Sequence, residues 1–356
     1  MRPILLSMIT MLTMIGYTGV AQAQTRDQIK IVGSSTVFPF STAVAEEFGR
    51  SSRFRTPIVE ATGSGGGFKL FCAGVGLLHP DITNASRKIL KSELDMCVKN
   101  GVSTITEIKI GYDGIVIANV KGAHHYQLTL REIYMALAKE IPNTETNSGF
   151  INNPYQRWNE INPNLPNIPI KVMGPPPTSG TRDALNVMAL EAGCRSFPQN
   201  RKLEQNDQQL FRRKCRSIRE DGAFIEEGEN DNLIVQKLLA DKNALGIFGY
   251  SFLDQNNDIM QGAMIATNGQ DYKKPTFENI TSGAYPVSRS LFFYVKNIHV
   301  SVVPGIHEFI NAFTSDMAWG EEGYLSDRGL IPLQDDERIK VAQTAKDLVA
   351  LPIQKP

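Results

Sequence analysis

Three short stretches rich in serine, threonine and glycine each stand between an apolar run and a segment with helical spacing. They are Gly-Ser-Ser-Thr-Val (33–37), Thr-Gly-Ser-Gly-Gly-Gly (62–67) and Thr-Ser-Gly-Thr-Arg (178–182). A helix N-terminus offers unpaired backbone N–H groups and the positive end of the macrodipole to an anion. Hydroxyl side chains add short donors, and glycine lets the backbone approach a ligand closely. Three turns of one chemistry therefore indicate a single pocket for a small oxyanion.

Two arginines accompany these turns. Arg182 ends the third turn, where a cation opposes the helix dipole unless an anion lies in front of it, and a guanidinium holds an oxyanion bidentately. Arg87 ends the motif Asn-Ala-Ser-Arg after a short strand-like segment, and a solvated surface role explains it equally well. Likewise, Ser35, Thr36 and Val37 alone are as typical of an ordinary helix cap as of a ligand site.

Catalytic and nucleotide-binding patterns are disfavoured. The glycine run lacks the Gly-Lys-Ser/Thr end of a phosphate-binding loop, and Phe68 replaces the last glycine of G-x-G-x-x-G. Ser64 lacks the G-x-S-x-G frame, because Thr62 stands where the first glycine belongs. We expect no catalytic residue, no metal site and no cofactor. The histidines show no metal-ligand spacing; they are His79, His124, His125, His299 and His307.

The N-terminus and the cysteines indicate export. Met1-Arg2, an apolar stretch over 4–20 and Ala-Gln-Ala at 21–23 predict a cleaved signal peptide, residues 1–23. Four cysteines in an exported chain predict two disulfides; proximity favours Cys72–Cys97 and Cys194–Cys215 among three possible pairings. Lys+Arg and Asp+Glu are equal at 37 each, so no global field favours nucleic acid.

Strand-like and helix-like segments alternate along the chain. This alternation predicts an α/β fold with βαβ units, and roughly 330 mature residues predict two lobes. Apolar runs at 29–32 and 58–61 are predicted strands. The run 108–118 is expected to pass from one lobe to the other, and 285–296 to return. The charged segment 199–220 is expected to be a helical arm pinned by a disulfide.

Taken in order, these motifs resemble the periplasmic phosphate-binding proteins of ABC importers (PstS type). Thr-Leu-Arg-Glu-Ile-Tyr (129–134), Trp-Asn-Glu-Ile-Asn-Pro (158–163) and Tyr-Pro-Val-Ser-Arg (285–289) support the resemblance, which covers nearly the whole mature chain. It implies a type II periplasmic-binding-protein fold, in which each lobe is a mixed, mostly parallel sheet flanked by helices. Lobe 1 would comprise 24–112 plus 286–356 and lobe 2 would comprise 113–285, joined by two crossover strands.

The same resemblance implies a function without covalent chemistry. A monomeric periplasmic receptor would bind inorganic phosphate between the lobes and deliver it to an ABC permease. Sulfate, molybdate or arsenate are alternative ligands, and an exported phosphoester hydrolase is a less favoured alternative. The implied ligand residues are Thr36 and Val37 with Ser35 as neighbour, Ser64, and Ser179, Gly180 and Thr181.

Two positions depart from the family pattern. Arg87 stands where an Asp usually follows Ala-Ser, and Pro175 stands where an Arg usually precedes Ser-Gly-Thr by four residues. We therefore expect a rewired site in which Arg87 and Arg182 supply the positive charge, as in a subgroup with Asn-Ala-Ser-Arg and Ser-Gly-Thr-Arg. Such a site would bind phosphate more tightly as pH rises from mildly acidic to neutral, unless Asp113 or Asp183 enters it.

Overall fold

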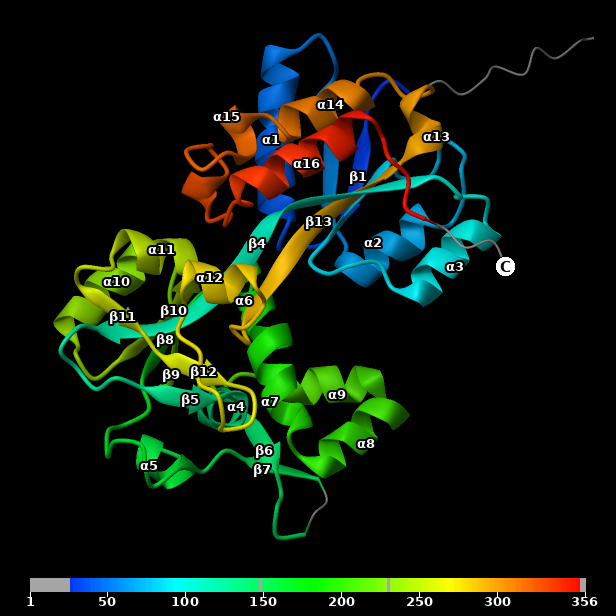
Figure 1. Cartoon of the computed structure of the whole chain (residues 1–356). Helices are drawn as coiled ribbons and strands as arrows, with labels where there is room; N and C mark the ends of the chain where they lie inside the picture. The colour runs from blue at the N-terminus through cyan, green and yellow to red at the C-terminus, as the bar shows by residue number, and fades with distance from the viewer. Residues whose placement is uncertain (1–25, 147–148, 229–230, 353–356) are drawn as a thin grey trace, which may run out of the picture.

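The computed structural model describes residues 26–146, 149–228 and 231–352, so the predicted signal peptide (1–23) lies outside the described residues. The fold is α/β and has two lobes joined by long strands (Figure 1). The strands are β1 Lys30–Gly33, β2 Ile58–Ala61, β3 Ile82–Ala85, β4 Ile105–Val120, β5 Gln127–Thr129, β6 Glu140–Pro142, β7 Phe150–Asn152, β8 Val172–Gly174, β9 Phe224–Glu226, β10 Leu245–Gly249, β11 Met260–Gly262, β12 Met264–Ala266 and β13 Ser288–Lys296.

The helices lie between these strands and include one π-helical segment (η1) and one 3-10 helix (η2). They are α1 Phe38–Ser51, α2 Ser64–Phe71, α3 Lys91–Lys99, α4 Leu130–Leu137, α5 Trp158–Ile161, α6 Gly180–Ala184, η1 Leu185–Leu190, α7 Glu191–Arg195, α8 Pro198–Asn206, α9 Gln208–Cys215, α10 Asp231–Ala240, α11 Tyr250–Gln255, α12 Phe277–Thr281, α13 Asn297–Val300, α14 Ile306–Phe313, α15 Asp316–Trp319, η2 Ser326–Arg328 and α16 Asp335–Lys346. None of these described helices is long and apolar enough to cross a membrane.

One mixed sheet extends through both lobes. Its strand order is β2-β1-β3-β13-β4-β10-β8-β9, and β11 also pairs with β4. Pairing is parallel for β1 with β2 and β3, and antiparallel for β13 with β3 and β4. The first part of β4 pairs with β13 and its last part with β10 and β11. Strand β4 therefore runs from one lobe into the other, as Figure 1 shows.

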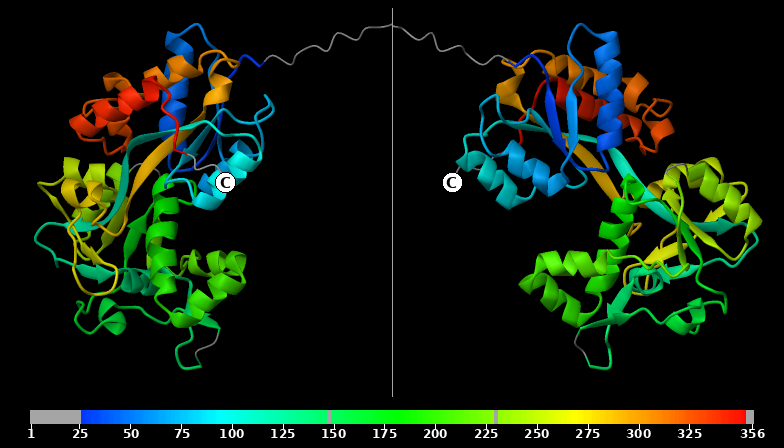
Figure 2. Two further views of the ribbon diagram at one scale, coloured as in Figure 1. Left: turned by 45° about the vertical axis from the view of Figure 1, so that its right-hand side comes forward. Right: turned by 180° about the vertical axis from the view of Figure 1, so that it is seen from behind.

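The upper lobe is a three-layer structure. Helices α1, α14 and α16 cover one face of its sheet, and α2 and α3 lie on the other (Figures 1 and 2). Phe48 of α1 packs edge-on against Phe309 of α14, with ring centroids 5.6 Å apart. The ring centroids of Phe293 in β13 and Phe313 in α14 are 5.0 Å apart, so β13 and α14 share this core.

The lower lobe carries the helical arm. Helices α8 and α9 form a pair beside α7 (Figure 2), and the disulfide Cys194–Cys215 links the end of α7 to the end of α9. The second disulfide, Cys72–Cys97, joins the residue after α2 to α3 in the upper lobe. Both bonds link the pairs that sequence proximity favoured.

The glycine run has a packing role that the sequence analysis did not foresee. Residues 65–67 form the first turn of α2, not a loop. A Cβ on Gly67 would lie 2.5 Å from Cα of Gly33 and 2.5 Å from Oγ1 of Thr83. Glycine at 67 is therefore required for α2 to pack closely against β1, and the expectation that ligand approach explains the whole run is too broad.

Candidate functional site

The three predicted turns lead into the N-termini of α1, α2 and α6. Thr129 and Ser179 cap α4 and α6 through their hydroxyls, and Ser179 Oγ accepts from the N–H of Thr181 at 3.1 Å. The first and third turns face each other across the lobes, because a Cβ on Gly180 would lie 3.5 Å from Cα of Thr36. The sequence-distant N-termini of α1 and α6 therefore meet in space.

Two cavities lie beside this meeting point. The larger, about 590 Å³, is lined by the first and second turns, one face of α6–α7 and the nearby end of the α8–α9 arm. The smaller, about 250 Å³, is lined by Thr36, Asp113, Arg328 and residues 178–181 of the third turn, among others. Their predicted ligand residues are divided as follows: Ser35, Ser64 and Arg87 line the larger cavity, and Thr36, Ser179, Gly180 and Thr181 line the smaller.

Val37 lines neither cavity. Its side chain is fully buried, and its backbone N–H donates to Oγ of Ser34 at 3.4 Å. The N–H that the resemblance assigned to a ligand is therefore engaged in the local turn before α1.

Ser64 is joined to the segment after β3. Its Oγ accepts from the backbone N–H of Ser86 at 3.1 Å and lies 3.2 Å from Oγ of Ser86. Ser86 also lines the larger cavity. The sequence analysis missed Ser86, although it lies within the Asn-Ala-Ser-Arg motif that drew attention to Arg87.

Arg87 lines the larger cavity but is already paired. Its two terminal nitrogens donate to the two carboxylate oxygens of Glu93 at 2.8 and 2.7 Å. The hydrogen bonds that Arg87 donates to Glu93 raise the pKa of Arg87, against the effect of partial burial. Arg87 therefore presents a fixed cation whose charge is largely compensated.

Arg182, expected to contact the ligand, lines neither cavity in this structure. It donates to the backbone oxygen of Pro175 at 2.8 Å and to Glu226 at 3.2 Å. Its guanidinium lies 4.9 Å from the ring centroid of Phe224. Its side chain is buried against β8 and β9, so its contacts are those of a packing residue.

Arg289 is a cation at the turns that the sequence analysis missed, as it missed Arg195, Arg212 and Arg216 in the larger cavity and Arg328 in the smaller. Its Nε donates to Oδ2 of Asp113 at 3.1 Å, and its Nη2 donates to Oγ1 of Thr36. Arg289 and Asp113 are register partners in the antiparallel pairing of β13 with β4. Arg289 also lines the larger cavity, so it connects the first turn with both strands that cross between the lobes.

Two acidic residues enter the site as well. Ser35 Oγ donates to Oδ2 of Asp183 at 3.2 Å, and Asp183 lines the larger cavity. Burial raises the pKa of Asp113, with Arg289 opposing and the charge of Asp183 adding to the rise. The sequence analysis expected phosphate affinity to rise with pH unless Asp113 or Asp183 entered the site. The structure places both carboxyl groups at the turns.

The histidines show no arrangement for metal binding. Across residues 26–146, 149–228 and 231–352, no group of three or more His, Cys, Asp or Glu side chains is placed to hold a metal ion. His299 is buried, with Nδ1 2.6 Å from Asp81 and Nε2 2.7 Å from the backbone oxygen of Val75. Both ring nitrogens are thus engaged within the protein.

A comparison with protein families assigns the fold. Residues 18–317 match the family model described as a PBP superfamily domain. The chain belongs to the PBP superfamily. Among solved structures, this PBP chain is similar to a possible phosphate binding protein from Planctomyces limnophilus. The two are 26% identical with a TM-score of 0.70, over 91% of this chain and 99% of the other. PstS from Borrelia burgdorferi, 16% identical with a TM-score of 0.53, shares the fold.

Two sequence relatives add names to the PBP assignment. Protein SphX from Synechococcus elongatus is 29% identical over 85% of this chain and 76% of its own length. Phosphate-binding protein PstS from Staphylococcus saprophyticus is 26% identical over 90% of this chain and 85% of its own length.

Proposed function

We propose that the protein is a periplasmic solute receptor that binds inorganic phosphate between its lobes and delivers it to an ABC permease. The observation that carries the proposal is the convergence of hydroxyl-rich helix N-termini on Arg289, which donates to Thr36 and pairs with Asp113. Oriented N–H and O–H donors with one guanidinium suit a tetrahedral oxyanion. The relatives named as phosphate-binding proteins support phosphate as that oxyanion.

The proposed ligand set differs from the expected one in its cation. Ser35, Ser64, Ser86 and Arg289 would donate to the phosphate, whereas Arg87 lines the same cavity with its charge largely compensated by Glu93. The remaining predicted donors Thr36, Ser179, Gly180 and Thr181 lie in the adjoining cavity, which ligand binding would merge with the larger one. Asp183 would accept a hydrogen bond from the O–H of a protonated phosphate.

Binding would proceed by hinge closure without covalent chemistry. We assign lobe 1 to residues 24–112 plus 286–356 and lobe 2 to 113–285, with β4 and β13 as the hinge. Contacts made only in the closed state would supply the free energy of closure. Export with removal of residues 1–23 and a monomeric state complete the proposal.

Titration calorimetry on the mature protein tests this function. Phosphate is expected to bind with one site, and sulfate, molybdate and arsenate are titrated in parallel to compare oxyanions. Binding of another oxyanion in preference to phosphate would identify a different receptor in the same class. Absence of oxyanion binding, or turnover of a chromogenic phosphoester abolished by Ser64→Ala, would overturn the receptor proposal.

A further inference from the structure

We propose that the larger cavity contains a second anion subsite at the end farther from the turns, formed by Arg195, Arg212 and Arg216. The protein would then bind linear oligophosphates in addition to inorganic phosphate. This inference rests on the proposed function, because the first phosphoryl group is placed at the turns. The argument uses the length of the cavity, the charges at its far end and the chemistry of its lining.

The cavity is too long for one phosphate ion. Asp183, Val187, Glu191 and Arg195 all line it, at intervals of four residues along the uninterrupted helical run α6–η1–α7. Twelve residues correspond to at most roughly 18 Å, the value for the α-helical rise, because the π-helical segment η1 is more tightly wound along its axis. A single phosphate at the N-terminus of α6 would leave the far part of this helix face without a ligand.

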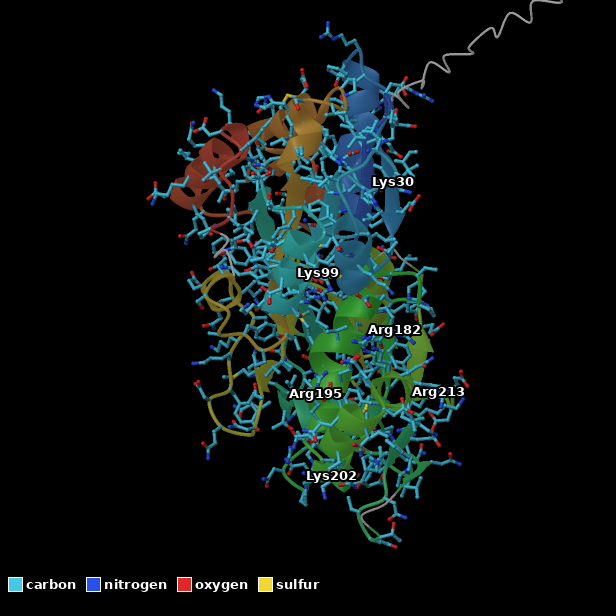
Figure 3. The ribbon with its side chains drawn as sticks, turned by 90° about the vertical axis from the view of Figure 1, so that its right-hand side faces the viewer. Lys30, Lys99, Arg182, Arg195, Lys202 and Arg213 are labelled. Atoms are coloured by element: carbon cyan, nitrogen blue, oxygen red, sulfur yellow. A yellow bond between two sulfur atoms is a disulfide. The ribbon has the colours of Figure 1, made fainter. Side chains whose placement is uncertain are left out.

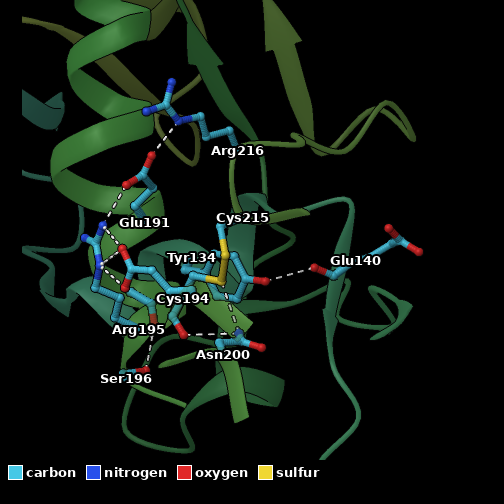
Figure 4. Close-up of a disulfide and its surroundings, with 11 residues drawn as sticks. Tyr134, Glu140, Glu191, Cys194, Arg195, Ser196, Asn200, Cys215 and Arg216 are labelled. Atoms are coloured by element: carbon cyan, nitrogen blue, oxygen red, sulfur yellow. Dashed lines mark hydrogen bonds and ion pairs between the residues drawn. A yellow bond between two sulfur atoms is a disulfide. The ribbon is translucent and has the colours of Figure 1, made fainter. Parts of the chain in front are cut away.

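The far end is built from fixed arginines. Glu191, whose side chain is 5% exposed, accepts from Arg195 at 2.7 Å and from Arg216 at 2.5 Å. Figure 4 shows Glu191 between these two guanidiniums, close to the disulfide Cys194–Cys215. One buried carboxylate thus orients two cations toward the cavity. Such prior ordering lowers the entropic cost of binding an anion.

Arg212 adds a cation that no carboxylate compensates by direct contact. Within the described parts of the chain its guanidinium forms no hydrogen bond and no ion pair, and the residue is exposed. Its charge assists Arg195 in lowering the pKa of Glu204. The other arginines that line the cavity each pair with a described carboxylate. Arg212 is therefore available to bind an anionic group of a ligand.

The lining favours a polyanion over an organic phosphate. Apart from Val187 and Met188, the cavity is lined by hydroxyl, glycine and charged residues, with no aromatic ring among its described lining. A nucleotide site commonly uses stacking, and sites for organic ligands are mostly apolar. A linear chain of phosphoryl groups matches donors that extend from the turns to Arg212.

The probe is inorganic tripolyphosphate, titrated into the mature protein by calorimetry in metal-free buffer, with phosphate as the reference. Arg212→Gln is the test variant. Arg213→Gln is the matched control, because Arg213 is the neighbouring exposed arginine of α9 and does not line the cavity (Figure 3). A thermal unfolding temperature equal to that of the wild type shows that each variant folds.

We expect the wild type to bind tripolyphosphate in competition with phosphate. In Arg212→Gln the ratio of tripolyphosphate to phosphate affinity is expected to fall about ten-fold or more, as for loss of a charged hydrogen bond. In Arg213→Gln it stays at the wild-type value. Phosphate binding without tripolyphosphate binding, or an unchanged ratio in Arg212→Gln, would overturn the second subsite alone. Tripolyphosphate binding without phosphate binding would support the subsite and overturn phosphate as the ligand.

Discussion

Ser35 donates a hydrogen bond to Asp183, 3.2 Å away, across 148 positions of the sequence. The contact joins the turn before α1 to the first turn of α6 and places a carboxylate among hydroxyl donors. A carboxylate there would accept a hydrogen bond from a protonated phosphate and repel an oxyanion that carries no proton. On the proposed function, Asp183 would therefore discriminate phosphate from sulfate.

Asp183→Asn is expected to narrow that discrimination. Loss of the negative charge removes the repulsion of sulfate, so sulfate affinity should rise relative to phosphate by about ten-fold. Competition calorimetry with both anions measures the ratio. Asp258→Asn, at an exposed position outside the cavity lining, is the control. An unchanged ratio in Asp183→Asn would remove Asp183 from the selectivity mechanism.

Asp113 is expected to make stability fall as pH rises. Burial raises the pKa of Asp113 in the folded protein, so between its ordinary pKa of 3.8 and the raised value the folded state holds a proton that the unfolded state has lost. The free energy of unfolding therefore decreases with pH across that window. Urea unfolding of the wild type and Asp113→Asn between pH 3.5 and 7, values chosen to bracket the ordinary range, measures the difference. A difference that is constant with pH would contradict this assignment.

Replacement of Arg289 by glutamine should weaken phosphate binding, whereas replacement of Arg182 should mainly lower the stability of the fold. Arg289→Gln removes the donor to Thr36 and leaves Asp113 unpaired, so phosphate affinity should fall by about 10- to 100-fold. Arg182→Gln should instead lower the free energy of unfolding by about 1–3 kcal/mol, because it removes contacts to Pro175 and Glu226. Calorimetry and urea unfolding on both variants separate the two effects. An equal loss of phosphate affinity in Arg182→Gln would show that Arg182 contacts the ligand after all.

Lys296 is expected to make the free energy of unfolding depend on pH in a second range, independently of Asp113. Its side chain is fully buried, its Nζ donates to the backbone oxygen of Gly74 at 2.6 Å, and burial lowers its pKa to about 8. Between pH 8 and 10.5 the unfolded state holds the proton and the folded state does not, so the contribution of Lys296 to stability rises with pH. The slope is at most about 1.4 kcal/mol per pH unit. Urea unfolding measures this rise in Lys296→Met and in the exposed control Lys99→Met. Only Lys296→Met should lose the increase in the free energy of unfolding with pH.

The parts of the site that depend on local sequence were predictable. The turn with Ser179 was expected to precede a helix, and the structure places Ser179 at the N-cap of α6, where its hydroxyl accepts from a backbone N–H. Arg182 was expected to be a ligand residue because it follows Ser-Gly-Thr, whereas the structure packs its side chain away from both cavities. Successive helical residues are rotated by about 100°, so Asp183 faces the cavity and Arg182 packs on Phe224.

The cation of the site depends on tertiary pairing. Arg289 and Asp113 are 176 positions apart, and the register of β13 against β4 sets them opposite each other. The sequence analysis expected segment 108–118 to pass from one lobe to the other and segment 285–296 to return. Two segments that cross in opposite directions can pair antiparallel, and this was the signal that could have brought Arg289 close to Asp113. The spacing of residues within one segment does not determine its register against a strand that is distant in the sequence.

The pairing of β4 with β13 has a mechanical consequence. Both segments that connect the lobes pass directly through the site, and each contributes one member of the Asp113–Arg289 pair. If the lobes close as proposed, the motion would bend the same two strands that carry these charges. Recognition of the anion's charge and rotation of the lobes would then depend on one short backbone segment, with no relay through the body of either lobe.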